Sequence, residues 1–386
     1  MSRTLTLAAV IGAMFSATAA PVLADSAPAV VVTVENVQPS RGTFLTPVWL
    51  GIHDGTFDSY DGGQPANVPL GGNEIEALAE DGNNGPITAT FELLQPTAPQ
   101  VSGLAGPGGP LAPGDRSATF LRVDPTQDRY FSYASMIIPS NDFFIANGNP
   151  LAHQLFNDAG EFVGEDFIVD GGETNDAGTE VNDEIASNVA FLAQAAGNTG
   201  VTENLPVTTP APGFAAPGTL AYPDGVLNYP VFGNGDFNDA DDAIVRVSFR
   251  YLDLAANQNF VSALSADNEV VAEEIASQGT GRARVIATGG ETVRVIVGTQ
   301  DLTGPITMAH LHLAQAGVNG PVVVDLGAGI NGNTVNAQIT EADLVDVLAG
   351  ADLETLIGEM AAGNVYINIH TDANPAGEIR GQVTLR

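Results

Sequence analysis

Apolar and polar residues alternate in short runs along most of the chain, and glycine, proline, asparagine and aspartate close the runs. In residues 243–252 (AIVRVSFRYL), Val245 and Val247 alternate with Arg246, Ser248 and Arg250. A period of two is typical of a β-strand with one face toward water. Similar runs predict further strands at residues 30–34, 46–53, 87–94, 117–123 and 132–138.

Helical signals are few. An asparagine followed by glutamates predicts a helix at 73–79, and a second helix is expected within 183–195. A third is expected within 340–360, where Thr340 and Asp343 resemble a capping box. The pattern therefore predicts an all-β protein with two antiparallel β-sandwich domains in tandem and a few short helices.

The length and the segment order predict how the chain is divided. Residues 1–24 have the features of a signal peptide: one arginine, an apolar run and a cleavage position near Ala24. The rest divides into a domain at 29–252 and a domain at 259–386. No other apolar stretch is long enough to span a bilayer. We therefore expect a protein that is secreted, periplasmic or on the cell surface, without membrane insertion.

The chain is strongly acidic and has no cysteine. The 386 residues include 46 acidic and 12 basic ones, and every basic residue is an arginine. The formal net charge is −34. Such a surface repels nucleic acid, so no nucleic-acid partner is expected, and it attracts cations. Adaptation to a saline habitat would explain the same charge. Because no disulfide can form, a bound metal ion is one way to fix the long loops.

One group of acids has the composition of a calcium site. Asp142 follows the predicted strand at 132–138, and Asp176 and Glu180 lie on either side of Gly178. A glycine allows a tight turn, so both carboxylates can point at one centre. Calcium prefers six to eight oxygen ligands. By spacing alone, a solvated acidic loop explains these residues better than a calcium site.

Three histidines form a second group. His310 and His312 are two residues apart, so on a strand their side chains share a face. His370 ends another apolar run. Three imidazoles brought together would suit copper or zinc. The alternative is that these histidines end strands and hydrogen-bond to loop carbonyls and to Asp372 or Glu378.

The N-terminal block resembles the spondin N-terminal domain of F-spondin, mindin and many bacterial secreted proteins. The resemblance is carried by residues 44–47 (FLTP), 52–54 (IHD), 77–82 (ALAEDG), 111–114 (LAPG), 132–142 (SYASMIIPSND) and 176–180 (DAGTE). It implies an antiparallel β-sandwich with a calcium ion held by loop carboxylates. The positions that match the family ligands are Asp142, Asp176 and Glu180.

Residues 259–386 resemble the CHRD domain of chordin and of microbial exported proteins. The matching segments are 264–270 (LSADNEV), 309–312 (AHLH), 319–323 (NGPVV), 363–371 (GNVYINIHT) and 375–381 (PAGEIRG). The resemblance implies a β-sandwich that is used in extracellular binding, without established catalysis.

Together these features predict a secreted bacterial protein that binds calcium and serves adhesion or the extracellular matrix, without catalysis. Its partner would be an extracellular protein or polysaccharide. No serine nucleophile elbow, phosphate loop or zinc-protease helix motif is present in the sequence. The alternative is a metalloprotein or metalloenzyme with a copper or zinc site at His310, His312 and His370.

Overall fold

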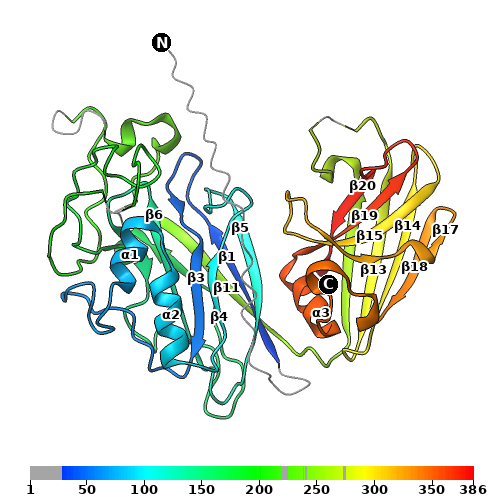
Figure 1. Ribbon diagram of the computed structural model, residues 1–386, viewed down its shortest axis with the longest axis horizontal. Helices are drawn as coiled ribbons and strands as arrows, with labels where there is room; N and C mark the ends of the chain where they lie inside the picture. Colours follow the sequence, from blue (N-terminus) through cyan, green and yellow to red (C-terminus); the bar gives the residue numbers. More distant parts are fainter. Residues whose placement is uncertain (1–27, 198, 220–224, 238, 240, 273–274) are drawn as a thin grey trace.

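The computed structural model describes residues 28–197, 199–219, 225–237, 239, 241–272 and 275–386 (Figure 1). The predicted signal peptide lies outside these residues. The described part is mostly β-structure in large antiparallel sheets, with three short α-helices. The predicted all-β class with two sheet domains in tandem is therefore confirmed. None of the helices in the described ranges is both long and apolar enough to cross a membrane.

The N-terminal domain is a sandwich of two sheets. The first has the order β5 (Arg116–Arg122), β1 (Ala29–Asn36), β11 (Ala243–Leu252) and β9 (Phe167–Asp170). The second has the order β10 (Asn175–Asp176), β7 (Phe143–Ala146), β6 (Tyr130–Ile138), β3 (Val48–His53) and β4 (Gln100–Leu104), with β2 (Phe44–Leu45) and β8 (His153–Gln154) also paired to β6. Val30, Val32 and Val34 of β1 pack in a shared core with Leu50 and Ile52 of β3.

Two helices, α1 (Glu74–Asp81) and α2 (Gly85–Leu94), pack on the second sheet (Figure 1). The first confirms the helix predicted at 73–79. The strand predicted at 87–94 is wrong, because this segment is α2. Pro86 lies in the first turn of the helix, where proline is favourable. Ile87 and Phe91, four residues apart, place their side chains in a core with Trp49.

The other two helix predictions need correction. Residues 183–195 form turns, and Glu184 and Phe191 have φ angles of 49° and 66°, which a right-handed helix does not allow. Within 340–360, the Thr340 capping box closes only a short 3-10 turn. The α-helix there is α3 (Leu353–Ala362), and the Asp352 side chain caps it by accepting from the Thr355 N–H.

The C-terminal domain has one continuous ten-stranded antiparallel sheet. Its order is β16 (Val322–Asp325), β15 (Ile306–Leu313), β19 (Val365–Thr371), β20 (Ile379–Gln382), β12 (Gln258–Ser265), β13 (Thr280–Thr288), β14 (Thr292–Gln300), β18 (Thr334–Ile339) and β17 (Ile330–Asn331), with β21 (Thr384–Leu385) on β12. The sheet curls, because β17 at one end contacts β15 near the other. Its inner face and α3 enclose a large apolar core.

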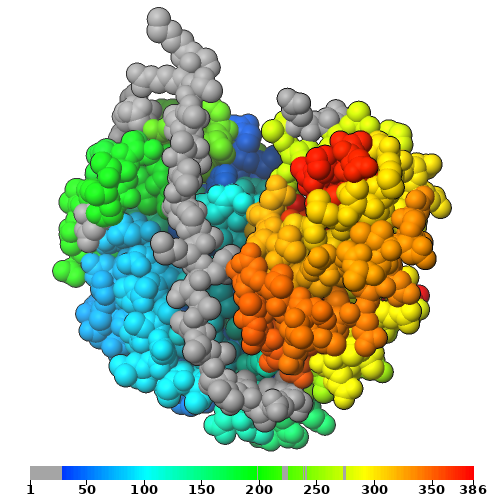
Figure 2. Space-filling view, turned by 45° about the vertical axis from the view of Figure 1, so that its right-hand side comes forward, coloured from blue at the N-terminus to red at the C-terminus, as the bar shows by residue number. Residues whose placement is uncertain are grey.

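The two domains pack directly against each other. Strand β1 is buried on both faces: while one face belongs to the N-terminal core, Ala29 and Val31 on the other join the C-terminal core. Helix α3 lies against β1 and β5. Arg122 of β5 forms an ion pair with Asp352, the residue that caps α3. Figure 2 shows the C-terminal domain, yellow to red, seated against the N-terminal domain.

Candidate metal sites

Asp142 lies at the centre of the acidic loops. It directly precedes β7, and its side chain is fully buried. Its Oδ2 atom accepts hydrogen bonds from the backbone N–H groups of Thr179 and Glu180, at 2.8 and 3.0 Å. Strand β10 pairs with β7 so that Asp176 is opposite Phe143, the neighbour of Asp142. The structure therefore brings the loop at 176–180 around Asp142.

Gly178 makes this turn possible. Its φ angle is 66°, in the left-handed region, and a Cβ atom there would lie 2.7 Å from the Leu205 carbonyl oxygen. The Gly178 N–H donates to Asp176 Oδ1 at 2.8 Å, and Asn182 Nδ2 donates to Asp176 Oδ2 at 2.7 Å. The tight turn expected from the sequence is confirmed.

Two carboxylate oxygens in these loops are buried without a hydrogen-bond partner. They are Asp142 Oδ1 and Glu180 Oε2, while Glu180 Oε1 accepts from the Gly200 N–H at 2.9 Å. Within the described residues, neither acid forms an ion pair with an arginine. A buried carboxylate without donors or a cation is costly, so this region has unused capacity to bind a positive charge.

The acids also affect each other's protonation. Burial raises the pKa of Asp142 to about 7, and the Asp176 charge adds to this effect. Burial likewise raises the pKa of Glu180 to about 7 and raises the pKa of Asp176. A fourth acid, Glu80 on α1, has a pKa raised to about 8, first by burial and also by the charges of Glu180 and Asp142.

Glu80 was not among the predicted ligands, although its segment carries the spondin resemblance. Its side chain is buried. The sequence pattern drew attention instead to the acids in the first turn of α1, which mark the start of a helix. The signal that could have identified it is the position of a glutamate directly after Leu78 and Ala79, which are both core residues.

The histidines form the closer group of candidate metal ligands. Among the described residues, the set of three His, Asp or Glu side chains whose ligand atoms all lie within 4.8 Å of one another is His310, His312 and His370. Asp142, Asp176 and Glu180 share one group of loops, which meet at Asp142. Calcium binding at these acids therefore stays a prediction.

The histidines come from two adjacent strands. On β15, Ala309 and Leu311 point into the core, so His310 and His312 occupy the opposite face. On β19, Ile367 and Ile369 point into the same core, which places His370 on the face of the other two histidines. The shared face predicted for His310 and His312 is confirmed, and the structure adds His370 to the same cluster.

Loop carbonyls orient two of the rings. His312 Nδ1 lies 3.0 Å from the Gly320 oxygen, and His370 Nδ1 lies 3.1 Å from the Pro375 oxygen. Because a carbonyl only accepts, each Nδ1 carries the proton and each Nε2 keeps a lone pair. His370 Nε2 lies 3.1 Å from His310 Nδ1, and His312 Nε2 is buried without a partner. The hydrogen bonds from histidine to loop carbonyls, which the sequence offered as an alternative to a metal site, are therefore present, and the three rings also form a cluster.

Burial is the main electrostatic influence on the cluster. It lowers the pKa of His310 and of His312, and it lowers the pKa of His370 to about 4, with further lowering by His310. Neutral imidazole is the form that binds metal ions. The rings are therefore in the ligand form at neutral pH.

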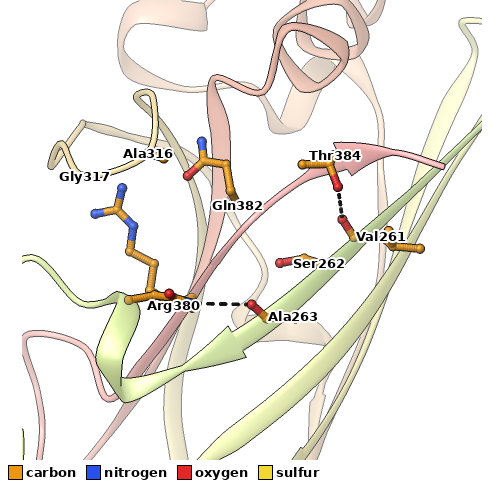
Figure 3. Close-up of a pocket in the computed structure, with 9 residues that line it drawn as sticks. Val261, Ser262, Ala263, Ala316, Gly317, Arg380, Gln382 and Thr384 are labelled. Atoms are coloured by element: carbon orange, nitrogen blue, oxygen red, sulfur yellow. Dashed lines mark hydrogen bonds between the residues drawn. The ribbon is translucent and has the colours of Figure 1, made fainter. Parts of the chain in front are cut away.

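A small pocket lies where β12 and β20 diverge (Figure 3). These strands pair only at Ser265 and Arg380, after which β21 takes over the pairing with β12. The pocket has a volume of about 400 Å³, and Ser262, Gln382 and Thr384 are among its lining residues. Ser262 Oγ is buried there without a hydrogen-bond partner. A volume of this size lies at the lower end of the range of pockets that bind small molecules.

Comparison with known proteins bears on the C-terminal domain. The family model described as CHRD domain matches residues 260–383. The match supports the CHRD resemblance of this part of the chain and an extracellular or binding role. No curated protein and no solved structure matches the chain. The spondin resemblance of the N-terminal domain stays a prediction.

Proposed function

We propose that the protein is an exported, non-catalytic binding protein of the adhesion or matrix type, and that a calcium ion braces its N-terminal domain. Two features support export: the CHRD match and the signal-peptide pattern at residues 1–24. The CHRD match also supports a binding role toward an extracellular protein or polysaccharide.

One observation carries the calcium part of the proposal. Asp142 Oδ1 and Glu180 Oε2 are buried carboxylate oxygens without a hydrogen donor. They lie in loops that are tied together through Asp142 Oδ2. A hard cation such as calcium satisfies carboxylate oxygens and tolerates irregular geometry, so it would supply the partner that these two oxygens lack. In a chain without disulfides, the ion would connect the loops at 142, 176–180 and 200.

Thermal unfolding of the purified chain tests the calcium site. Calcium should raise Tm relative to the chelated protein, because the ion binds only the folded state. At 100 times Kd the gain is about 2.7 kcal/mol. This corresponds to roughly 5–10 °C for a domain of this size.

Asp142→Asn keeps the side-chain shape and an oxygen acceptor for Thr179 and Glu180, and removes the charge. We expect this variant to fold and to lose the calcium-dependent rise in Tm. Asp241→Asn, at an exposed acid outside these loops, should keep it. An unchanged Tm of the wild-type chain at saturating chelator and at saturating calcium would contradict the proposal, and so would an equal calcium response in Asp142→Asn.

A further inference from the structure

We propose that His310, His312 and His370 bind one copper ion on the outer face of the C-terminal sheet. This site is separate from the acidic loops, which belong to the N-terminal domain. It does not depend on the proposed calcium ion.

The positions of the ring nitrogens support a shared ion. Two nitrogen ligands at about 2.0–2.1 Å from one ion lie roughly 2.9 Å apart in a square-planar site and roughly 3.3 Å apart in a tetrahedral one. His310 Nδ1 and His370 Nε2 are 3.1 Å apart. One ligand nitrogen from each of the three rings lies within 4.8 Å of the other two. His312 Nδ1 is bonded to the Gly320 carbonyl, which leaves its Nε2 for a metal ion. When the ion binds, His310 changes tautomer: the proton on its Nδ1 leaves to solvent and its Nε2 takes up a proton, so the ring stays neutral.

The surroundings hold the ligands in place. His312 and His370 each donate their second ring N–H to a loop carbonyl, the usual arrangement around metal-binding histidines. His312 also stacks on Tyr366, with ring centres 4.7 Å apart and an interplanar angle of 8°. Because the three histidines lie on paired strands, the site is largely formed before a metal arrives.

His312 Nε2 is the second observation that points to a ligand. It is a buried lone pair without a hydrogen donor, although it lies beside two other imidazoles. Buried polar atoms are normally satisfied, and an unsatisfied one needs an explanation. A metal ion accepts this lone pair directly.

The choice of copper follows from the chemistry of the donors. Three neutral imidazoles offer no oxygen to a hard cation such as calcium, and they suit copper and zinc. Among divalent ions, copper binds a given nitrogen site more tightly than zinc. Met308 lies opposite His370 in the strand register and two residues before His310, so a thioether stands on the same face. Thioethers also favour copper.

The test uses the full chain, freed of transition metals and kept in excess calcium, and titrated with copper sulfate or zinc sulfate. Calorimetry should give one copper per chain, bound more tightly than zinc. The electron paramagnetic resonance spectrum of the copper form should show coupling to imidazole nitrogens. Because calcium is held in excess throughout, the result does not depend on the calcium proposal.

His310→Ala and His312→Ala should each weaken copper binding by more than about 100-fold, since loss of a second-shell partner alone costs roughly 10- to 100-fold. The matched control is His153→Ala, at a histidine that stacks on Phe167 in the N-terminal domain. Circular dichroism establishes that each variant is folded. Absence of stoichiometric copper, absence of nitrogen coupling, tighter binding of zinc, or full copper affinity in both cluster variants would overturn the proposal.

Discussion

The guanidinium carbon of Arg380 lies 3.4 Å from the centre of the Tyr366 ring, and both side chains are almost completely buried. Within the described residues Arg380 has no ion pair with a carboxylate. Instead its Nη2 donates to the Val318 carbonyl at 2.7 Å and its Nη1 to Asn319 Oδ1 at 3.0 Å. A buried cation is thus held by an aromatic face and neutral acceptors, with the Glu269 carboxylate near enough to act on it electrostatically. It fixes the loop beside His312.

Arg380→Lys should destabilise the protein, although it keeps the charge. A lysine ammonium cannot spread over the Tyr366 ring and reach both loop acceptors at once. We expect a loss of about 2–3 kcal/mol in the free energy of unfolding, measured by urea denaturation.

The matched control is Arg284→Lys, because Arg284 is exposed on β13 and donates to Asn259 at 3.0 Å. That change should cost less than about 0.5 kcal/mol. Equal costs for the two substitutions would show that the stacked arrangement of Arg380 contributes nothing specific.

Glu378 gives a prediction about acid stability. Burial alone would raise the pKa of this carboxyl group, but hydrogen bonds from Thr371, Ser277 and Thr303 outweigh it and lower the pKa to about 2. The folded pKa is below the ordinary value of 4.5, so the stabilisation is present above pH 4.5. It is lost as the pH falls from 4.5 toward 2.

Glu378→Gln should remove roughly 2–3 kcal/mol at neutral pH and flatten the fall in stability between those two pH values. Urea unfolding at a series of pH values measures both effects. Asp372→Asn, at an exposed acid on the same turn, should leave the slope unchanged. If the slope of the Glu378→Gln variant matches that of the wild-type chain, the hydrogen bonds to Glu378 do not set its pKa.

Strands could be predicted from the sequence where one face of the strand is exposed to solvent, because apolar and polar residues then alternate. Apolar and polar residues alternate from Val245 to Arg250, and β11 has the bounds predicted from the run at 243–252. The segment at 87–94 failed because Ile87, Thr88 and Thr90 favour a strand locally, whereas packing of Ile87 and Phe91 against Trp49 favours a helix. Tertiary contacts of this kind are not visible in a short window of sequence.

In the candidate sites, too, local patterns could be predicted from the sequence and long-range contacts could not. The spacing of His310 and His312 predicts a shared face, because it depends only on the period of a strand. The pairing of β15 with β19, which brings in His370, depends on a long-range register. Glu80 reaches the acidic loops from a helix, so no local motif connects it to Asp142. The predicted partner of the histidines, Glu378, instead accepts from hydroxyl groups and a backbone N–H.

Contact between the domains provides the last prediction. Gly358 is buried in the middle of α3, where an added Cβ atom would lie 2.5 Å from a ring carbon of Phe120 on β5. The glycine therefore lets the helix approach the N-terminal sheet closely. In an exposed helix, Gly→Ala stabilises by about 1 kcal/mol. Here the clash should reverse the sign, and Gly358→Ala should cost about 1–3 kcal/mol.

A double-mutant cycle with Phe120→Ala separates the clash from the helix propensity. Phe120→Ala alone removes packing against the C-terminal core and should be destabilising. In that background the ring is gone, so Gly358→Ala should become neutral or stabilising by up to about 1 kcal/mol. Urea unfolding of the four proteins measures the coupling. If Gly358→Ala stabilises the chain while Phe120 is present, the domains do not pack as closely as the contact between α3 and β5 requires.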